Sequence, residues 1–199
     1  MSPLVAADEV RLLEIARASV AHGLQRGRAL PLDPAAEAPA LREPGASFVT
    51  LRTARAELRG CVGSLEAERA LAADVAENAF RAAFRDPRFA PVARDELTAL
   101  EFSIAILGLP ERIEVASAEE LAAVLQRGRD GLILRQGVRG ATFLPEVWTS
   151  LTDPHEFVRA LERKAGIESW SAGVEAFRYA VRTLGGAARD RSGERSPRR

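Results

Sequence analysis

A short stretch of the chain, Leu58-Arg-Gly-Cys-Val-Gly63, holds the single cysteine among 199 residues. A cysteine acts as a nucleophile or a metal ligand in its thiolate form, which a neighbouring base, cation or helix N-terminus stabilises. Glycines on either side let a substrate approach the backbone closely. Cys61 is therefore a candidate nucleophile. The alternative is a buried thiol that packs as a small apolar side chain, as free cysteines commonly do.

An extended strand would sort these six residues onto two faces, because side chains alternate along a strand. A packing face would carry Leu58, Gly60 and Val62, and a presented face would carry Arg59, Cys61 and Gly63. The Cα atoms of Arg59 and Cys61 would lie about 7 Å apart, so that a guanidinium and a thiol share one surface. We predict Cys61 and Arg59 as catalytic residues, with Gly60 and Gly63 in contact with substrate.

A second charged stretch, Arg85-Asp-Pro-Arg88, lies between two phenylalanines. Its two guanidinium groups are suited to bidentate binding of a carboxylate or a phosphate. The same arginines could instead form ion pairs with Asp86 or Asp95 that fasten a loop. Both interpretations remain open, and we predict Arg85, Asp86 and Arg88 as substrate-binding residues.

Asn78 interrupts an apolar stripe in the middle of a predicted helix. A buried amide without partners costs roughly 1–3 kcal/mol, so its side chain must form hydrogen bonds. We include Asn78 among the substrate-binding residues, with a hydrogen bond to a neighbouring loop as the alternative. His22 and His155 lie near helix ends, where we expect solvation. One cysteine and two distant histidines lack metal-ligand spacing, and no phosphate-loop or dinucleotide motif occurs, so we predict neither metal nor cofactor.

The composition indicates a soluble cytoplasmic protein. With 28 basic and 28 acidic residues the formal charge is zero, which argues against a nucleic-acid or anionic-membrane partner. A single cysteine forms no internal disulfide, and neither a signal peptide nor an apolar run of ~18 residues occurs. Residues 185–199 hold five arginines against Asp190 and Glu194, a net of +3, and we predict a basic disordered tail.

The elements that must position the candidate residues are read from hydrophobic periodicity. In the first half we expect a helix over about 9–25 with Asp8 as its N-cap, and an irregular connection over 28–46. A hairpin of 47–53 and 57–63 follows, then a helix over about 70–84 that is apolar on two sides and therefore central. The apolar face predicted for the first helix consists of Val10, Leu13, Ala16, Val20 and Leu24.

In the second half, a strand around residues 102–106 precedes a helix that begins with a capping box at Ser117 and ends at Gly128. Strands over 131–136 and 138–144 flank a turn at Gly137, and Asp153 caps a helix that ends at Gly166. A last strand is expected over 174–183. Hairpins favour an α+β fold with an antiparallel or mixed sheet and flanking helices, and the length allows one domain or two small lobes.

The hexapeptide at residues 58–63 resembles the hallmark of the AMMECR domain family, protein A of the AmmeMemoRadiSam system, with Val62 in place of isoleucine. The likeness extends over about residues 8–184. Further segments that resemble the family are Phe48–Leu51, Asp74–Ala79, Ala82–Phe89, Asp130–Leu134, Phe143–Trp148 and Lys164–Gly166. The chain departs from the family in three places: the hairpin turn lacks the usual glycine or aspartate, His155 stands where relatives tend to have a carboxylate, and the tail is no family feature.

This resemblance implies an α+β fold in two lobes packed into one compact unit, a cytoplasmic location and relatives that form homodimers. It also implies radical SAM and Memo-type proteins as partners, whereas the family's activity is unsettled. Three hypotheses follow. The first is an enzyme or enzyme component that acts on, or presents, a small anionic or nucleotide-like substrate at the hexapeptide. The second is a non-catalytic adaptor for those partners, and the third is an RNA-associated regulatory protein, against which the neutral charge argues.

Overall fold

The computed structural model describes residues 3–171 and 173–186, which fold into two compact units. The first unit runs to Ile104 and resumes at Thr183, and the second spans Ala105–Arg182. Both divisions fall within strands, so the chain passes from one unit to the other along β3 (Glu101–Leu107) and returns along β8 (Val181–Gly185). The fold class is α+β, as predicted, with two four-stranded sheets and five α-helices among the described residues.

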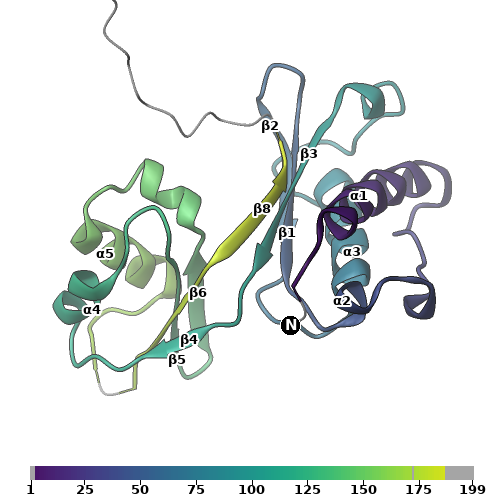
Figure 1. Ribbon diagram of the computed structural model, residues 1–199. Helices are drawn as coiled ribbons and strands as arrows, with labels where there is room; N and C mark the ends of the chain where they lie inside the picture. The colour runs from purple at the N-terminus through teal and green to yellow at the C-terminus, as the bar shows by residue number, and fades with distance from the viewer. Residues whose placement is uncertain (1–2, 172, 187–199) are drawn as a thin grey trace, which may run out of the picture. The chain divides into compact units, whose positions relative to one another are not determined.

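The first unit places helices beside a sheet with the strand order β2-β1-β3-β8 (Figure 1). Its remaining elements are α1 (Ala6–Arg26), η1 (Pro34–Ala36), α2 (Pro39–Arg42), β1 (Ser47–Arg52), β2 (Leu58–Gly63), α3 (Leu71–Phe84) and η2 (Leu97–Ala99). The strands β1 and β2 form the predicted antiparallel hairpin, and β2 lies at the edge of the sheet. The candidate cysteine is therefore on an edge strand.

The hairpin turn replaces the missing glycine signal with side-chain hydrogen bonds. The hydroxyl of Thr53 accepts from the backbone amides of Arg55 and Glu57, each at 3.3 Å. Ala56 takes a left-handed conformation with φ of 62°. Such a turn is specified by local hydrogen bonds rather than by an Asn-Gly or Asp-Gly pair.

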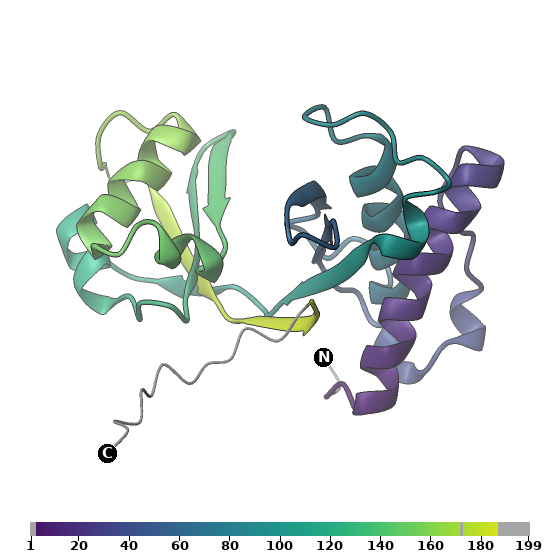
Figure 2. The same cartoon turned by 90° about the horizontal axis from the view of Figure 1, so that it is seen from above.

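Helix α3 is central, as its two apolar sides predicted. One side packs on the hairpin and the other on α1, which runs beside it (Figure 2). The rings of Phe80 and Phe84 lie 5.2 Å apart and face Gly23 of α1. A Cβ at Gly23 would stand 2.8 Å from a ring carbon of Phe80, so this glycine allows the two helices to approach.

The predicted start of α1 is wrong, and its predicted apolar face is correct only at Ala16 and Val20. The helix is capped at Val5, and the carboxylate of Asp8 accepts a hydrogen bond from the Val5 amide at 3.0 Å. Val10 is exposed, and the residues that α1 buries against its neighbours are Leu12, Ile15, Ala16, Ser19, Val20 and Gly23. The buried face includes Gly23, beside the rings of α3, and Ser19, whose hydroxyl donates to the Ala76 carbonyl of α3 at 2.7 Å. A count of apolar residues does not detect such positions.

The connection over 28–46 is more ordered than predicted. It contains η1 and α2, and Leu41 of α2 is fully buried. Glu37 is also buried, where it forms an ion pair with Arg11 of α1 at 2.8 Å. The prolines at the start of each short helix supply the φ angle of a first helical turn, so the proline content marks helix starts rather than irregular chain.

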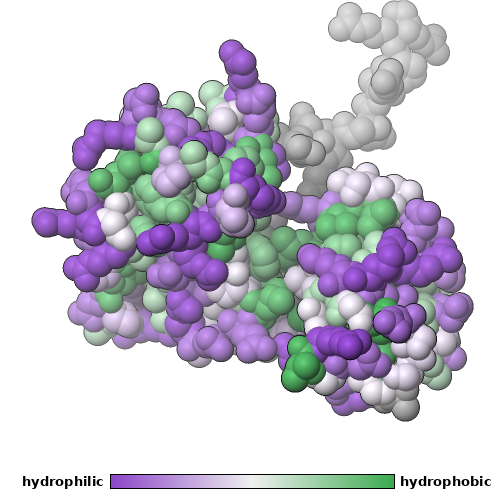
Figure 3. Space-filling model, turned by 180° about the vertical axis from the view of Figure 1, so that it is seen from behind, coloured by the Kyte–Doolittle hydropathy of each residue, from purple (hydrophilic) through white to green (hydrophobic). Residues whose placement is uncertain are grey.

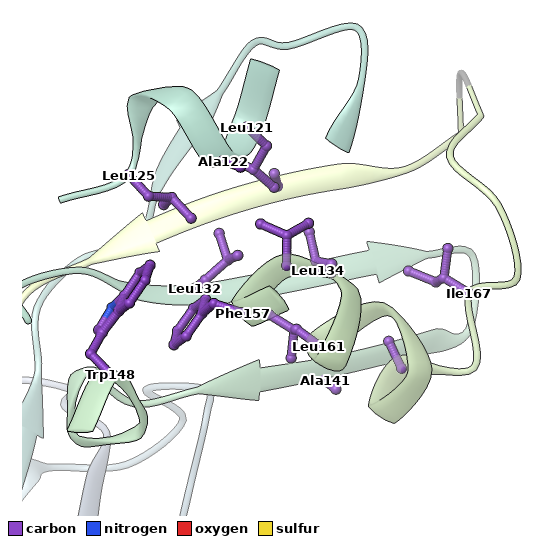
Figure 4. Close-up of a cluster of buried hydrophobic side chains, with 13 residues drawn as sticks. Leu121, Ala122, Leu125, Leu132, Leu134, Ala141, Trp148, Phe157, Leu161 and Ile167 are labelled. Atoms are coloured by element: carbon purple, nitrogen blue, oxygen red, sulfur yellow. The ribbon is translucent and has the colours of Figure 1, made fainter. Parts of the chain in front are cut away.

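The second unit has the sheet order β4-β7-β5-β6. Its elements are β4 (Glu111–Ile113), α4 (Ala118–Val124), β5 (Gly131–Gln136), β6 (Arg139–Phe143), η3 (Pro145–Thr149), α5 (Pro154–Ala165) and β7 (Glu175–Tyr179). Strand β5 pairs antiparallel with β6 and β7, and the predicted turn at Gly137 joins β5 to β6. The core of this unit centres on Trp148 and Phe157, whose rings stack with centroids 3.8 Å apart (Figure 4).

Two predictions for the second unit are wrong at element ends. Helix α4 begins at the predicted Ser117 cap but ends at Val124, because Asp130 binds the amide of Gln126 in a turn that stops the helix before Gly128. The strand predicted over 174–183 is two strands, β7 and β8, in different sheets. They separate at Ala180, whose carbonyl accepts from the amide of Gly108 at 2.8 Å. The predicted start and end of α5, at Asp153 and Gly166, are confirmed.

Hydrophilic side chains cover most of the face shown in Figure 3, as a chain with 28% charged residues requires. Among the described helices, none combines the length and the apolar character that crossing a membrane demands. Residues 187–199 of the predicted basic tail lie outside the described part of the chain, and Gly185, where the tail was predicted to begin, is the last residue of β8.

Candidate functional site

Cys61 lies on the face of the hairpin that points away from α3. Its neighbour Gly60 is directed at α3, where a Cβ would collide with the backbone carbonyl of Ala82. Because side chains alternate, Cys61 belongs to the opposite face, and its side chain is half-buried. Gly60 and Cys61 lie on opposite faces, as predicted, whereas the register shift between Leu51 and Arg52 pairs Leu58 with Arg52 and interrupts the predicted alternation before Gly60.

Both glycines of the hexapeptide have a role inside the fold. Gly60 allows α3 to pack closely on β2. A Cβ at Gly63 would collide with the ring of Phe48, which lies directly across the hairpin. The space beside each glycine is therefore filled by the chain itself, which accounts for both residues without a bound substrate.

Thr50 is the residue directly opposite Cys61 in the hairpin. Its hydroxyl donates a hydrogen bond to the Cys61 sulfur, with Oγ1 and Sγ 3.3 Å apart. A hydroxyl that donates to sulfur favours the thiolate over the thiol. Sequence reasoning missed Thr50, because a register shift between Leu51 and Arg52 displaces the pairing by one residue from a count that starts at the turn.

Asp86 and Arg88 hold the backbone of Cys61 at the free edge of β2. The Cys61 amide donates to a carboxylate oxygen of Asp86 at 2.9 Å, and Nη2 of Arg88 donates to the Cys61 carbonyl at 3.2 Å. Arg88 also binds Asp86 with two nitrogens, Nε at 2.9 Å and Nη2 at 2.7 Å. Of the two interpretations of residues 85–88, this geometry matches the ion pair that fastens a loop.

The electrostatics of Asp86 follow from these contacts. Its side chain is 2% exposed, and the hydrogen bonds from Arg88 hold the pKa of the carboxyl well below its usual range, although burial opposes the shift. The same pair raises the pKa of Arg88, and the side chain of Cys61 adds to this through a hydrogen bond and its charge. Arg88 is therefore the cation that accompanies the thiol. Half of its side chain, 54%, remains exposed.

Arg59 shares the strand with Cys61 but is occupied elsewhere. Its guanidinium binds both carboxylate oxygens of Glu96, at 2.7 and 3.0 Å. It also donates to the carbonyls of Ala90 at 2.9 Å and Pro91 at 3.4 Å. With 14% of its side chain exposed, Arg59 anchors the segment after α3, and these bonds lower the pKa of Glu96. Glu96 was not among the predicted residues, and nothing in its local sequence distinguishes it.

Asn78 belongs to a buried polar network behind the hairpin. Its amide nitrogen donates to the Ser47 carbonyl at 3.0 Å, the Ser64 hydroxyl at 3.1 Å and the Asp74 carboxylate at 2.9 Å. Asp74 in turn accepts from Ser47 and Ser64. This network ties the start of β1 and the end of β2 to α3, so Asn78 satisfies its hydrogen bonds within the fold.

The remaining candidates lie on the surface or apart from Cys61. Arg85 is exposed and its guanidinium makes no hydrogen bond or ion pair with the described residues. His155 is exposed, as predicted. His22 differs from its prediction, because it is half-buried and its Nε2 is shielded without a partner among those residues. Within residues 3–171 and 173–186, no three His, Cys, Asp or Glu side chains gather as metal ligands would.

Fold and site together define the class of protein. It is an α+β protein in which an Asp–Arg pair binds the backbone of a cysteine on an edge strand. The chain belongs to the AMMECR1 family, whose model matches residues 13–184. This confirms the resemblance read from the hexapeptide and the segments around it.

Relatives extend over most of the chain. A protein of Thermofilum pendens is 35% identical over 196 residues, which cover 90% of each sequence. A protein of Methanosarcina barkeri is 39% identical over 140 residues, or 69% of this chain and 68% of its own. The crystal structure of the uncharacterized protein PH0010 from Pyrococcus horikoshii matches with a TM-score of 0.75 and 28% identity, covering 87% of this chain and 88% of that one.

Proposed function

We propose that the helix-free face of the β1–β2 hairpin binds a small anionic or nucleotide-like substrate and uses the Cys61 thiolate on it. One observation carries the proposal: the Sγ of the half-buried Cys61 accepts a hydrogen bond from Thr50, while Arg88 donates to the carbonyl of the same residue. A thiolate beside a fixed cation is the arrangement that activated cysteines use.

The charges nearby set the class of substrate. Arg88 keeps half of its side chain exposed despite its bonds to Asp86, and Arg85 is exposed three residues before it. An anion that approaches the sulfur meets at least one guanidinium, and arginine binds carboxylate and phosphate oxygens in bidentate fashion. Arg59 contributes to the fold rather than to binding, since Glu96 and two carbonyls occupy it.

The family membership extends the proposal to the cellular setting. The chain acts as a component of an AmmeMemoRadiSam-type system in the cytoplasm, as a homodimer and alongside radical SAM and Memo-type proteins. The anionic substrate would be acted on at Cys61 or presented there to such a partner. Co-purification of the chain with those partners from its own cells tests this setting separately from the chemistry.

Two alkylating reagents test the site directly. Iodoacetate is an anion and iodoacetamide is neutral, and both attack the same thiolate, so the ratio of their rates reports the local charge rather than the degree of ionisation. A unit charge within a few ångströms in water contributes about 1 kcal/mol, or about a fivefold change in rate. We expect the iodoacetate-to-iodoacetamide ratio at Cys61 to exceed that of N-acetylcysteine amide by about threefold.

Matched variants identify the residues that make Cys61 react preferentially with the anionic reagent. Arg88→Gln and Arg85→Gln should each lower the ratio, whereas Arg94→Gln, an exposed arginine further along the same segment, should leave it unchanged. A ratio in the native protein no higher than that of the small thiol would refute an anion site at Cys61.

A second candidate function, a non-catalytic adaptor for the same partners, is favoured by one observation. Four of the candidate residues pack against or bind other parts of the chain, which leaves few for chemistry: Gly60, Gly63, Arg59 and Asn78. Cys61→Ser separates the two functions. Loss of cellular function with partner binding intact supports a thiol reaction, and retention of both supports the adaptor.

A further inference from the structure

The segment over residues 86–96 is bound to β2 at two alternate positions of the strand. Asp86 and Arg88 bind the amide and the carbonyl of Cys61, and Glu96 with two carbonyls binds the side chain of Arg59. Between these anchors Val92 is buried, and its amide donates to the Ala83 carbonyl of α3 at 2.9 Å. The segment therefore occupies the free edge of the sheet beside the thiol.

Asp86 stands at the centre of this attachment. Its two carboxylate oxygens accept from the Cys61 amide, the Arg88 amide at 3.1 Å and two nitrogens of the Arg88 guanidinium. A bidentate pair of this kind fixes the plane of the guanidinium as well as its distance. Half of the Arg88 side chain faces solvent, so without Asp86 the guanidinium would be free to leave Cys61.

We propose that residues 86–96 form a clamp on β2 in which Asp86 is a positioning residue: it holds the Arg88 guanidinium beside Cys61 and thereby creates the anion preference of the thiol. The inference rests on the proposed function and adds how that site is controlled. The Arg59–Glu96 pair is the second anchor of the clamp. The positioning role of Asp86 has a counterintuitive consequence: an acidic residue is required for Cys61 to attract an anion.

The sign of the Asp86→Asn effect separates positioning from simple electrostatics. If Asp86 acted only through its charge, its neutralisation would raise the iodoacetate-to-iodoacetamide ratio at Cys61. If Asp86 positions Arg88, the ratio falls about threefold, to the level of Arg88→Gln, because an amide cannot accept both guanidinium hydrogen bonds. The double variant should then equal Arg88→Gln alone. A ratio equal to or above the native one refutes the positioning role.

Hydrogen exchange of the Cys61 amide tests the clamp without any reagent. This amide donates to Asp86 and not to β1, whereas the amides of Gly60 and Val62 point toward β1 in an antiparallel pair. Arg59→Met removes the second anchor and keeps the aliphatic stem. We expect faster exchange at Cys61 in this variant and unchanged exchange at Gly60 and Val62, with Arg178→Met as the control.

The outcomes test the proposed function and the clamp separately. A native protein without anion preference refutes the proposed function, and the clamp is then judged by exchange alone. Anion preference that persists in Asp86→Asn refutes Asp86 as the positioning residue while the site stands. Native exchange at Cys61 in Arg59→Met refutes the second anchor. Thermal unfolding of each variant confirms that the chain is folded when the rates are measured.

Discussion

The hydroxyl of Thr50 donates a hydrogen bond to the sulfur of Cys61 across the β1–β2 hairpin, at 3.3 Å. The two residues are direct partners in the register, and the Cys61 amide turns outward to Asp86 rather than toward β1. They therefore form a non-hydrogen-bonded pair, in which the side chains lie closest. The hairpin register brings the hydroxyl to the thiol, and the first prediction depends on this contact.

Thr50→Val should slow the alkylation of Cys61 at neutral pH about fivefold, because the variant keeps the shape of the side chain and removes a hydrogen bond of about 1 kcal/mol. The iodoacetate-to-iodoacetamide ratio should stay constant, since Arg88 is untouched. Thr98→Val, at an exposed position, is the matched control. An unchanged rate in Thr50→Val would show that the hydroxyl does not act on the sulfur.

Gly60→Ala should destabilise the protein by about 1–3 kcal/mol, because the added methyl group collides with the backbone carbonyl of Ala82 and overpacks the helix–strand contact. Urea unfolding of the variant and the native protein measures this difference. Gly173→Ala is the control, since nothing lies within 4 Å of the added Cβ. Equal stability of all three proteins would contradict a packing role for Gly60.

Asn78→Ala distinguishes a structural from a substrate-binding role for this residue. The loss of its amide leaves Ser47, Ser64 and Asp74 with missing partners, and we expect a loss of about 1–3 kcal/mol in the free energy of unfolding. The two alkylation rates at Cys61 should match the native rates under conditions where the variant is folded. A native unfolding midpoint combined with altered alkylation would favour substrate binding instead.

The stability of the protein should fall as the pH drops below about 4, the range in which carboxyls of an unfolded chain take up protons. Arg88 holds the pKa of folded Asp86 well below that range, so the unfolded chain binds the proton first and acid favours unfolding. The contribution of Asp86 is therefore complete at neutral pH. Urea midpoints between pH 7 and pH 3 should decline more steeply in the native protein than in Asp86→Asn.

Tyr179 is the single tyrosine of the chain, so its ionisation can be followed by ultraviolet absorbance without assignment. Burial raises the pKa of Tyr179 to about 12, although its hydrogen bond with Thr142 opposes the shift. The pKa of Tyr179 is higher in the folded than in the unfolded protein. The neutral side chain therefore stabilises the fold below about pH 10, and this stabilisation is lost as the pH rises further. A titration midpoint near that of the urea-unfolded protein would contradict the burial.

Local patterns were sufficient to predict much of the fold. The two apolar sides of α3, the Asp153 start of α5, the two hairpins and the opposite faces of Gly60 and Cys61 follow from periods of 3.6 and 2 and from the chemistry of caps and turns. These features depend on residues a few positions apart, whose geometry the backbone alone sets. The errors at Val10 and at Ala180 fall where packing on another element decides which residue is buried or where a strand ends.

The sequence by itself determined that Cys61 would lie on the face of the hairpin opposite Gly60, together with the family to which the chain belongs. Only the tertiary structure decided which groups reach it: Arg88 rather than Arg59 is the accompanying cation, and Thr50 donates to the sulfur. The physical reason is separation along the chain. Arg88 lies 27 residues beyond Cys61, and the path that returns it to β2 is set by Asp86, Val92 and Glu96, whose partners no local period encodes.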